Sequence, residues 1–196
     1  MFTGIIETTG VIKQIIKQNS NLTFVIETKF TNELKVDQSI AHNGICLTVE
    51  KVENNLHTVT AIEETINKTT IASWKIDDII NIERCLKVNS RIDGHFVQGH
   101  VDTTAVCCEK LDINGSCTFT FSIAEKFANL IIEKGSICVN GISLTCFNVT
   151  KNSFTVAIIP YTFTNTNMHS ITVGNYVNIE FDVLGKYINR AKELGS

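Results

Sequence analysis

Apolar and polar residues alternate along most of the chain with the two-residue period that is typical of half-buried β-strands. The clearest segments are rich in β-branched and aromatic residues and occur in both halves: Leu22–Ile26, Leu47–Val49, His57–Thr60, Thr118–Phe121 and Phe154–Ala157. Turn-forming pairs recur between such segments, at Asn43-Gly44, Asn54-Asn55, Asn114-Gly115, Asn140-Gly141 and Gly174-Asn175. This pattern predicts an all-β protein with a small antiparallel barrel or sandwich in each half.

Helical periodicity is confined to short segments. Residues 125–132 place apolar side chains at i, i+3 and i+4, residues 32–36 are a weaker counterpart, and residues 65–74 and 162–170 each favour a turn of helix at their start. The last segment, residues 185–196, predicts a C-terminal helix because its apolar residues lie on one face: Tyr187, Ile188, Ala191 and Leu194. That face packs either on its own domain or on another subunit.

The strand pattern of the first half is repeated in the second. At an offset of 97 positions, residues 39–62 align with residues 136–159, and half of the aligned residues are identical. A shorter match at an offset of 95 relates residues 4–9 to residues 99–104. A repeat of this length has the size of a small domain, so it indicates a tandem duplication. We expect homologous domains over residues 1–90 and 91–184, followed by the helix over residues 185–196.

Differences between the two copies point to candidate chemistry. In the alignment of the two copies, Cys46 corresponds to Ser143, and Ile5 corresponds to His100. Cys46 stands two positions before Thr48, and Ser143 stands two positions before Thr145. In each of these pairs the two side chains therefore point to the same face of a strand. The pattern around Cys46 fits a nucleophilic role, but it also fits an ordinary position in a barrel hairpin. No spacing typical of a catalytic triad surrounds Cys46 to favour the nucleophilic role. His95, in the histidine- and glycine-rich segment 94–102, is either a linker residue or a functional one.

Composition narrows the classes of function. The chain has 43% hydrophobic and 19% charged residues with a net charge of −3 and no basic cluster, which argues for an ordered protein and against nucleic-acid binding. No export signal or membrane span is recognisable. Seven cysteines without Cys-x-x-Cys spacing predict reduced, mostly core-packed thiols in a cytoplasmic protein. His95 and His100 lack a third ligand, so no metal site is expected.

Several long motifs in register closely resemble the riboflavin synthase family. They are residues 1–7 (MFTGIIE), 39–49 (SIAHNGICLTV), 94–102 (GHFVQGHVD), 134–136 with 141–145 (KGS and GISLT) and 177–180 (VNIE). The resemblance implies two six-stranded Greek-key barrels per chain and homotrimers held by the C-terminal helix. It implies an active site between the N-terminal barrel of one subunit and the C-terminal barrel of the next. It also implies a possible association with lumazine synthase.

The implied reaction is a dismutation without metal or redox cofactor. Two molecules of 6,7-dimethyl-8-ribityllumazine exchange a four-carbon unit, which yields riboflavin and 5-amino-6-(D-ribitylamino)uracil. The substrates would occupy two similar pockets. One would be lined by Gly4, Ile5, Ile6, Cys46, Leu47, Thr48, Thr60, Ala61, Ile62, Glu63, Glu64 and Thr65. The other would be lined by Gly99, His100, Val101, Lys134, Ser143, Leu144, Thr145, Ile159, Pro160, Tyr161, Thr162, Phe163 and Thr164.

The resemblance assigns catalysis to Ser39, Cys46 and His100, with Asp182 as a further polar candidate. One lumazine must lose a proton from its C7 methyl group, and an imidazole near neutral pKa suits that step. The chain departs from the family pattern at Asn140, where Asp is usual, and at Tyr161. A non-catalytic lumazine-binding antenna protein of the same fold is the main alternative, but such proteins typically lose the catalytic side chains retained here. A third hypothesis, a flavin-binding domain of a reductase, has less support, since no dinucleotide-binding fingerprint is present.

Overall fold

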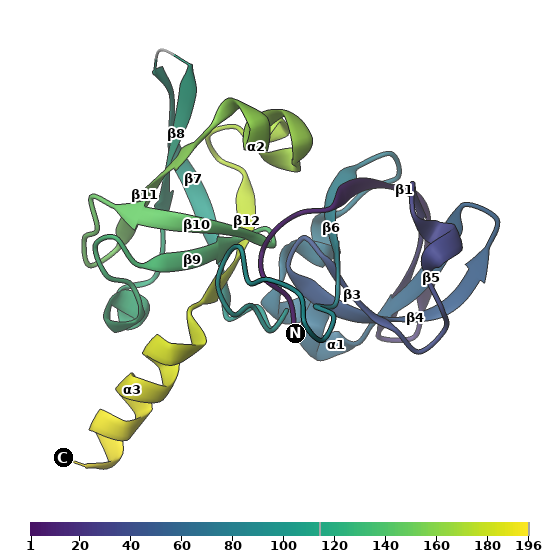
Figure 1. The fold of residues 1–196 in the computed structure, drawn as a ribbon, viewed down its shortest axis with the longest axis horizontal. Helices are drawn as coiled ribbons and strands as arrows, with labels where there is room; N and C mark the ends of the chain where they lie inside the picture. The colour runs from purple at the N-terminus through teal and green to yellow at the C-terminus, as the bar shows by residue number, and fades with distance from the viewer. Residues whose placement is uncertain (114, 196) are drawn as a thin grey trace.

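The computed structural model describes residues 1–113 and 115–195, which form two closed antiparallel barrels and a C-terminal helix (Figure 1). The first barrel contains β1 (Thr8–Gln18), β2 (Asn21–Thr28), β3 (Ser39–His42), β4 (Ile45–Glu53), β5 (Leu56–Ala61) and β6 (Ile79–Arg84). The second contains β7 (Thr103–Ile113), β8 (Ser116–Ser122), β9 (Ser136–Val139), β10 (Ile142–Phe147), β11 (Ser153–Ile158) and β12 (Tyr176–Phe181). Both have the same circular order, with β2 beside β5 and β3 beside β6 in the first copy. This is the predicted six-stranded Greek-key arrangement.

Short helices connect the strands at the positions where the sequence favours helical turns. They are α1 (Glu63–Lys68), α2 (Pro160–Asn165) and the 3-10 helices η1 (Thr31–Glu33), η2 (Thr70–Ser73), η3 (Glu125–Leu130) and η4 (Asn167–Ser170). The segment predicted as a helix over residues 125–132 is therefore a 3-10 helix. Of the predicted turns, Asn114-Gly115 falls partly outside the described residues, because Asn114 is not among them.

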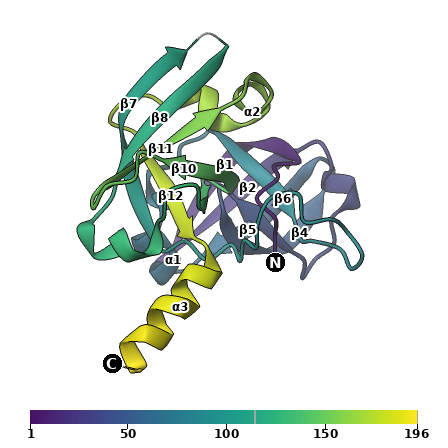
Figure 2. The same ribbon diagram turned by 60° about the vertical axis from the view of Figure 1, so that its left-hand side comes forward.

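The C-terminal helix α3 spans Val183–Leu194. Asp182 caps its N-terminus, where the Asp182 side chain accepts a hydrogen bond from the Leu184 N–H at 3.0 Å. Figure 2 shows α3 projecting away from both barrels. Its apolar residues Tyr187 and Ile188 are 73% and 70% exposed in the single chain, so they do not pack on their own domain. The described residues include no helix that is long and apolar enough to cross a membrane.

Each barrel encloses its own hydrophobic core, in which aromatic rings meet at close range. Phe24 packs edge-on against Trp74 in the first core, and Phe121 packs against Phe154 in the second. The first core differs by a fully buried pair, His42 and His57, whose Nε2 atoms lie 2.9 Å apart. The equivalent residues of the second copy are Val139 and Phe154, so the fold does not require this polar pair.

The barrels meet at their two Asn-Gly turns, which lie back to back. A Cβ atom on Gly44 would stand 2.8 Å from the backbone nitrogen of Gly141, and the reverse distance is the same. Asn81 donates a side-chain hydrogen bond to the Asn140 carbonyl, and Asn178 donates one to the Asn43 carbonyl, both at 2.9 Å. Because the contacts are reciprocal, the sequence repeat is also an approximate two-fold symmetry of the structure.

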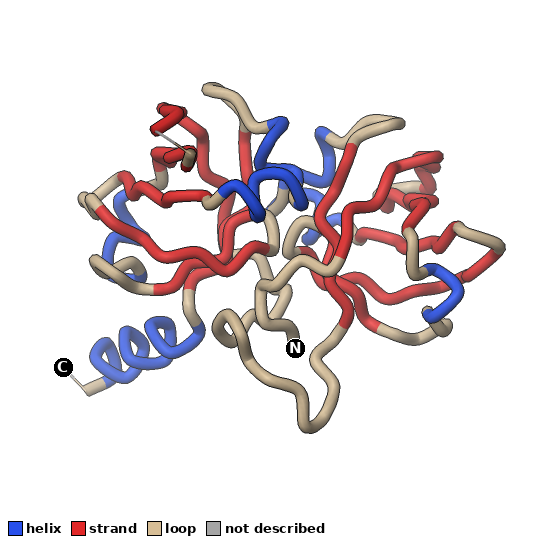
Figure 3. The backbone as a smooth tube through the Cα atoms, turned by 45° about the horizontal axis from the view of Figure 1, so that its top comes forward, coloured by secondary structure: helices blue, strands red, loops and turns tan. Residues whose placement is uncertain are grey.

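Each copy sends its N-terminal segment to the other barrel. Phe2 and Val97 exchange backbone hydrogen bonds. Figure 3 shows loop segments between the two barrels beside the N-terminus. Beyond this crossing, the Gly4 carbonyl accepts a hydrogen bond from the Ser143 N–H at 2.8 Å, while the Gly99 carbonyl accepts one from the Cys46 N–H at 2.9 Å. Residues 1–6 therefore reach a strand of the second barrel, and residues 97–101 reach a strand of the first.

Candidate active site

The first pocket opens beside Cys46, at the start of β4. Its volume is about 210 Å³, and it is lined by Ile45, Cys46, Glu64, Thr65, Lys68, Thr69, Gly99, His100 and Val101. Burial raises the pKa of the Cys46 thiol, and a hydrogen bond with Ser39 opposes this shift. The thiol is thus protonated at neutral pH and needs a base before it can act as a nucleophile. Of the nearby groups, the exposed imidazole of His100 is suited to proton transfer.

The second pocket occupies the equivalent place on the other barrel. It has a volume of about 490 Å³ and is lined by Lys134, Ser143, Leu144, Thr145, Phe147, Ala157, Ile159 and Thr162. Lys134 has a left-handed backbone, with φ of 63°, and the equivalent residue of the first copy is Asp37, with φ of 70°. The same loop conformation therefore carries a cation at one pocket and an anion at the other barrel.

The structure corrects the predicted grouping of the site residues. We predicted that Gly4, Ile5 and Ile6 share a pocket with Cys46, and that Gly99, His100 and Val101 share one with Ser143. Instead, Gly4 contacts Ser143, and Gly99 contacts Cys46 in the first pocket. Ile5 lines a separate cavity beside Glu83 and Arg84. Ile6 packs against the second core and Val101 against the first. The alignment of the two copies identifies equivalent residues, but it cannot reveal that the segments cross between the barrels.

His95, whose place the sequence left undecided, lies beside Ser143. Its Nδ1 lies 2.7 Å from the Ser143 Oγ, and the side chain is buried. Burial lowers the pKa of His95, and the charge of Asp182 opposes that shift. Its Nε2 is also buried and has no hydrogen-bond partner within the described part of the chain. A neutral imidazole that accepts at Nδ1 can take the proton of a hydroxyl group, and Ser143 lines the second pocket.

The remaining predicted residues are distributed around the pockets. Ser39 pairs with Thr48 across β3 and β4, whereas Leu47 and Ala61 are buried in the first core. Tyr161 is exposed on α2, and a neighbouring cavity of about 360 Å³ takes in Pro160, Phe163 and Thr164 instead. The others lie on exposed or partly exposed surfaces near β5 and α1: Thr60, Ile62 and Glu63.

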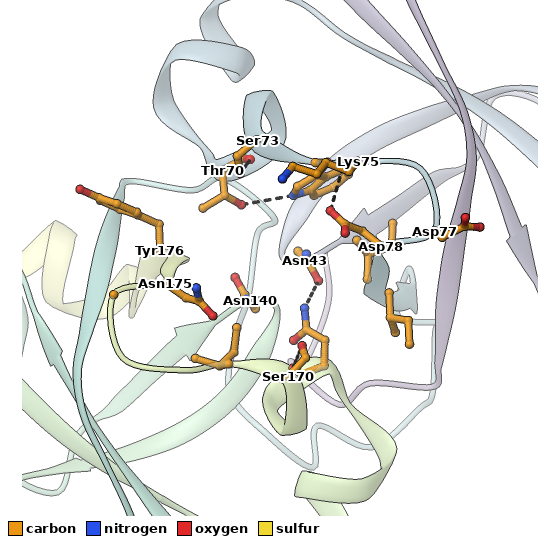
Figure 4. Close-up of a pocket in the computed structure, with 16 residues that line it drawn as sticks. Asn43, Thr70, Ser73, Lys75, Asp77, Asp78, Asn140, Ser170, Asn175 and Tyr176 are labelled. Atoms are coloured by element: carbon orange, nitrogen blue, oxygen red, sulfur yellow. Dashed lines mark hydrogen bonds between the residues drawn. The ribbon is translucent and has the colours of Figure 1, made fainter.

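A further cavity of about 600 Å³ lies between the barrels, and Figure 4 shows the residues around it. Its walls are equivalent residues of the two copies, such as Ser73 with Ser170, and none of the predicted site residues lines it. Asn140 forms part of its floor, where its Oδ1 accepts the Asn178 N–H at 2.8 Å as Asn43 does for Asn81 at 2.7 Å. The departure from the family's aspartate thus lies in the contact between barrels and outside both pockets.

Comparison with known proteins agrees with this architecture. The family model described as "Lumazine binding domain" matches residues 3–85 and again residues 98–182. The riboflavin synthase of Actinobacillus pleuropneumoniae is 40% identical and aligns with 97% of this chain and 89% of its own. That of Brucella abortus is 38% identical, with 97% of each chain covered.

Among solved structures, LumP complexed with riboflavin is similar with a TM-score of 0.86 over 92% of this chain and 99% of that chain. Its sequence is 20% identical, so this likeness supports the fold alone. The two-fold match to the lumazine-binding model and the identity to riboflavin synthases over nearly the whole length are the stronger evidence. The chain belongs to the riboflavin synthase family.

Proposed function

We propose that this protein is the enzyme that converts two molecules of 6,7-dimethyl-8-ribityllumazine into riboflavin and 5-amino-6-(D-ribitylamino)uracil. The observation that carries the proposal is the match to riboflavin synthases along nearly the whole chain, which includes both pockets. Two similar pockets, one from each of two neighbouring subunits, suit a reaction between two identical substrates, because orientation of the reactants supplies much of the rate.

The two pockets differ in ways that suit different roles. In the first, Cys46 is held against the backbone of Gly99, with His100 adjacent on the same segment. His100 would move the proton of the C7 methyl group or of the thiol. In the second, Ser143 with His95 would add to C7 of the other lumazine, and Lys134 would favour a developing negative charge on it. Asp182 acts on this pair through its charge near His95.

The active site of the assembled enzyme would form between subunits of a homotrimer. The exposed apolar residues of α3, Leu184, Tyr187, Ile188 and Leu194, support assembly through this helix, since a contiguous apolar face tends to be covered by a partner. We further propose that the protein is a transferase, that it is cytoplasmic, and that it associates with lumazine synthase.

Assembly through α3 can be tested with Ile188→Glu, which should shift the sedimentation of the protein from trimer to monomer and reduce activity with it. Val88→Glu is the matched control, because Val88 is exposed in the loop between the barrels and lies outside α3. A trimer that survives Ile188→Glu would show that α3 does not hold the subunits together.

The reaction itself is tested by incubating the purified protein with 6,7-dimethyl-8-ribityllumazine and following riboflavin by absorbance and chromatography. We expect two lumazines consumed for each riboflavin formed. The alternative, an antenna protein, predicts that the lumazine binds and remains fluorescent without conversion. Binding without any riboflavin over many hours would favour that alternative.

A further inference from the structure

Two buried glutamates at equivalent positions hold the crossing segments in place. Glu83 on β6 and Glu180 on β12 are 4% and 2% exposed, and the offset between them is that of the repeat. Neither forms an ion pair with another described residue. Lys186, a cation whose charge acts on Glu180, pairs with Asp102 at 2.6 Å. Because an unpaired buried carboxylate is costly, backbone donors must compensate for it.

Glu180 accepts hydrogen bonds from three consecutive backbone N–H groups. Its Oε1 accepts from Gln98 at 2.6 Å, and its Oε2 accepts from Gly99 at 2.9 Å and from His100 at 2.8 Å. Glu83 makes the equivalent contacts to the other segment, with Oε1 accepting from the Thr3 N–H at 2.7 Å and Oε2 from the Gly4 N–H at 3.1 Å. In both cases the two carboxylate oxygens are used, which an amide side chain cannot reproduce.

The glutamate that contacts His100 also determines where the segment meets the first pocket. Gly99 is bonded to Glu180 and lies so close to Cys46 that a Cβ atom there would be 2.6 Å from the Cys46 Cβ. The backbone of residues 98–100 is therefore held from both sides, by the carboxylate and by β4. The imidazole of His100 extends from this fixed backbone into the pocket.

We propose that Glu180 is a positioning residue that fixes the backbone of residues 98–100 and thereby holds His100 beside Cys46. Glu83 has the corresponding task for Gly4 beside Ser143. This assignment rests on the proposed function, since it concerns the reactivity of the same pocket. It differs from a purely structural role in one respect: the effect of Glu180 on the reaction passes through His100.

The test is a double-mutant cycle between Glu180→Gln and His100→Gln, with single-turnover riboflavin formation as the measurement. We expect Glu180→Gln alone to slow the reaction about 100-fold, in line with the cost of misplacing a catalytic group by about 1 Å. In the His100→Gln background the same substitution should slow the reaction less than about threefold, because little catalysis by His100 is left to lose. Glu83→Gln is the matched control, and its effect should be the same in both backgrounds.

Full additivity of Glu180→Gln with His100→Gln would overturn the proposal, as would equal coupling for Glu83→Gln. Thermal midpoints of all variants separate loss of folding from loss of rate. If Glu180→Gln does not fold, Glu180→Asp replaces it, since it keeps the charge but shortens the reach.

Hydrogen exchange gives a readout that does not depend on turnover. The amides of Gln98, Gly99 and His100 should be protected in the wild-type protein and exchange at least tenfold faster in Glu180→Gln. Unchanged protection would overturn the anchoring even if the wild-type protein makes no riboflavin, so failure of the proposed function and failure of this inference remain distinguishable.

Discussion

The first barrel has Cys46 in its pocket and the pair His42 and His57 in its core, where the second barrel has Ser143, Val139 and Phe154. Strand order and turn conformation are nevertheless the same in both. These differences thus lie in side chains that the fold does not require. The crossing segments extend the contrast, because the first pocket receives His100 while the equivalent residue, Ile5, belongs to the segment that contacts the second barrel.

The contrast between His100 and Ile5 gives the largest expected effect. His100→Gln should slow single-turnover riboflavin formation by about 100-fold, the lower range for loss of an acid-base group, while lumazine affinity changes less than about threefold. Cys46→Ser should act in the same direction, because it replaces the more nucleophilic group at nearly constant size. His169→Gln, at an exposed histidine outside both pockets, is the control. Unchanged turnover in both pocket variants would remove the catalytic asymmetry between the barrels.

The crossing leads to a second prediction, about the isolated N-terminal half. Because Phe2 pairs with its own equivalent Val97, and Gly44 with its equivalent Gly141, two copies of residues 1–90 can make the same contacts with each other. We expect this fragment to form a homodimer that binds lumazine or riboflavin in two equivalent pockets but does not convert lumazine, since it lacks His100.

Light scattering and fluorescence titration on the same fragment measure dimerisation and binding together. A fragment of residues 7–90 is the control, and it should lose both the dimer and at least tenfold in affinity. Tight binding by a monomeric fragment would show that the crossing segment is dispensable for the pocket.

These results show what the sequence could and could not predict. Alternation, Asn-Gly turns and the repeat were sufficient for two all-β domains, each a barrel or a sandwich, because alternation and turns are local signals that both copies report independently. The closed six-stranded barrel came from the family resemblance. The grouping of site residues was wrong for Gly4 and Gly99, because residues far apart in sequence determine which barrel each segment joins. The contact of His95 with Ser143 was also hidden, since the two residues are distant along the chain.

The buried histidine pair predicts a difference in acid stability. His42 Nδ1 lies 3.1 Å from the Ile40 carbonyl, so it donates there, and His42 Nε2 must accept from His57. Burial lowers the pKa of His57 to about 4 and lowers that of His42 as well. The unfolded chain takes up protons below pH 6.5 while the folded chain does not, so stability is lost as the pH falls from 6.5 toward 4.

For His57 alone, the loss at pH 5 relative to pH 7 is about 2 kcal/mol. The double variant His42→Val with His57→Phe, which copies the second core, should lose this dependence. Urea unfolding at both pH values measures it. Glu83, whose pKa burial raises to about 6, opposes the trend by gaining stability as the pH falls, but it contributes equally to both proteins. An equal loss in the double variant would contradict the prediction.

The smallest expected effect concerns the contact between the barrels, where Asn167 stands at the position equivalent to Thr70. The Asn167 side chain donates a hydrogen bond to Asn43 Oδ1 at 3.0 Å and accepts one from Asn81 Nδ2 at 2.9 Å. Within the described part of the chain, the Thr70 side chain makes no equivalent contacts. Since the first copy accommodates Thr at this position, Asn167→Thr should remove these bonds without strain and cost about 1 kcal/mol of the free energy of unfolding. Asn165→Thr, an exposed site on α2, makes the same chemical change outside the network and should stay within about 0.5 kcal/mol of wild type. Urea unfolding of both variants measures the difference, with an unchanged slope expected. If Asn167→Thr is as stable as Asn165→Thr, the two side-chain hydrogen bonds of Asn167 do not stabilise the contact between the barrels.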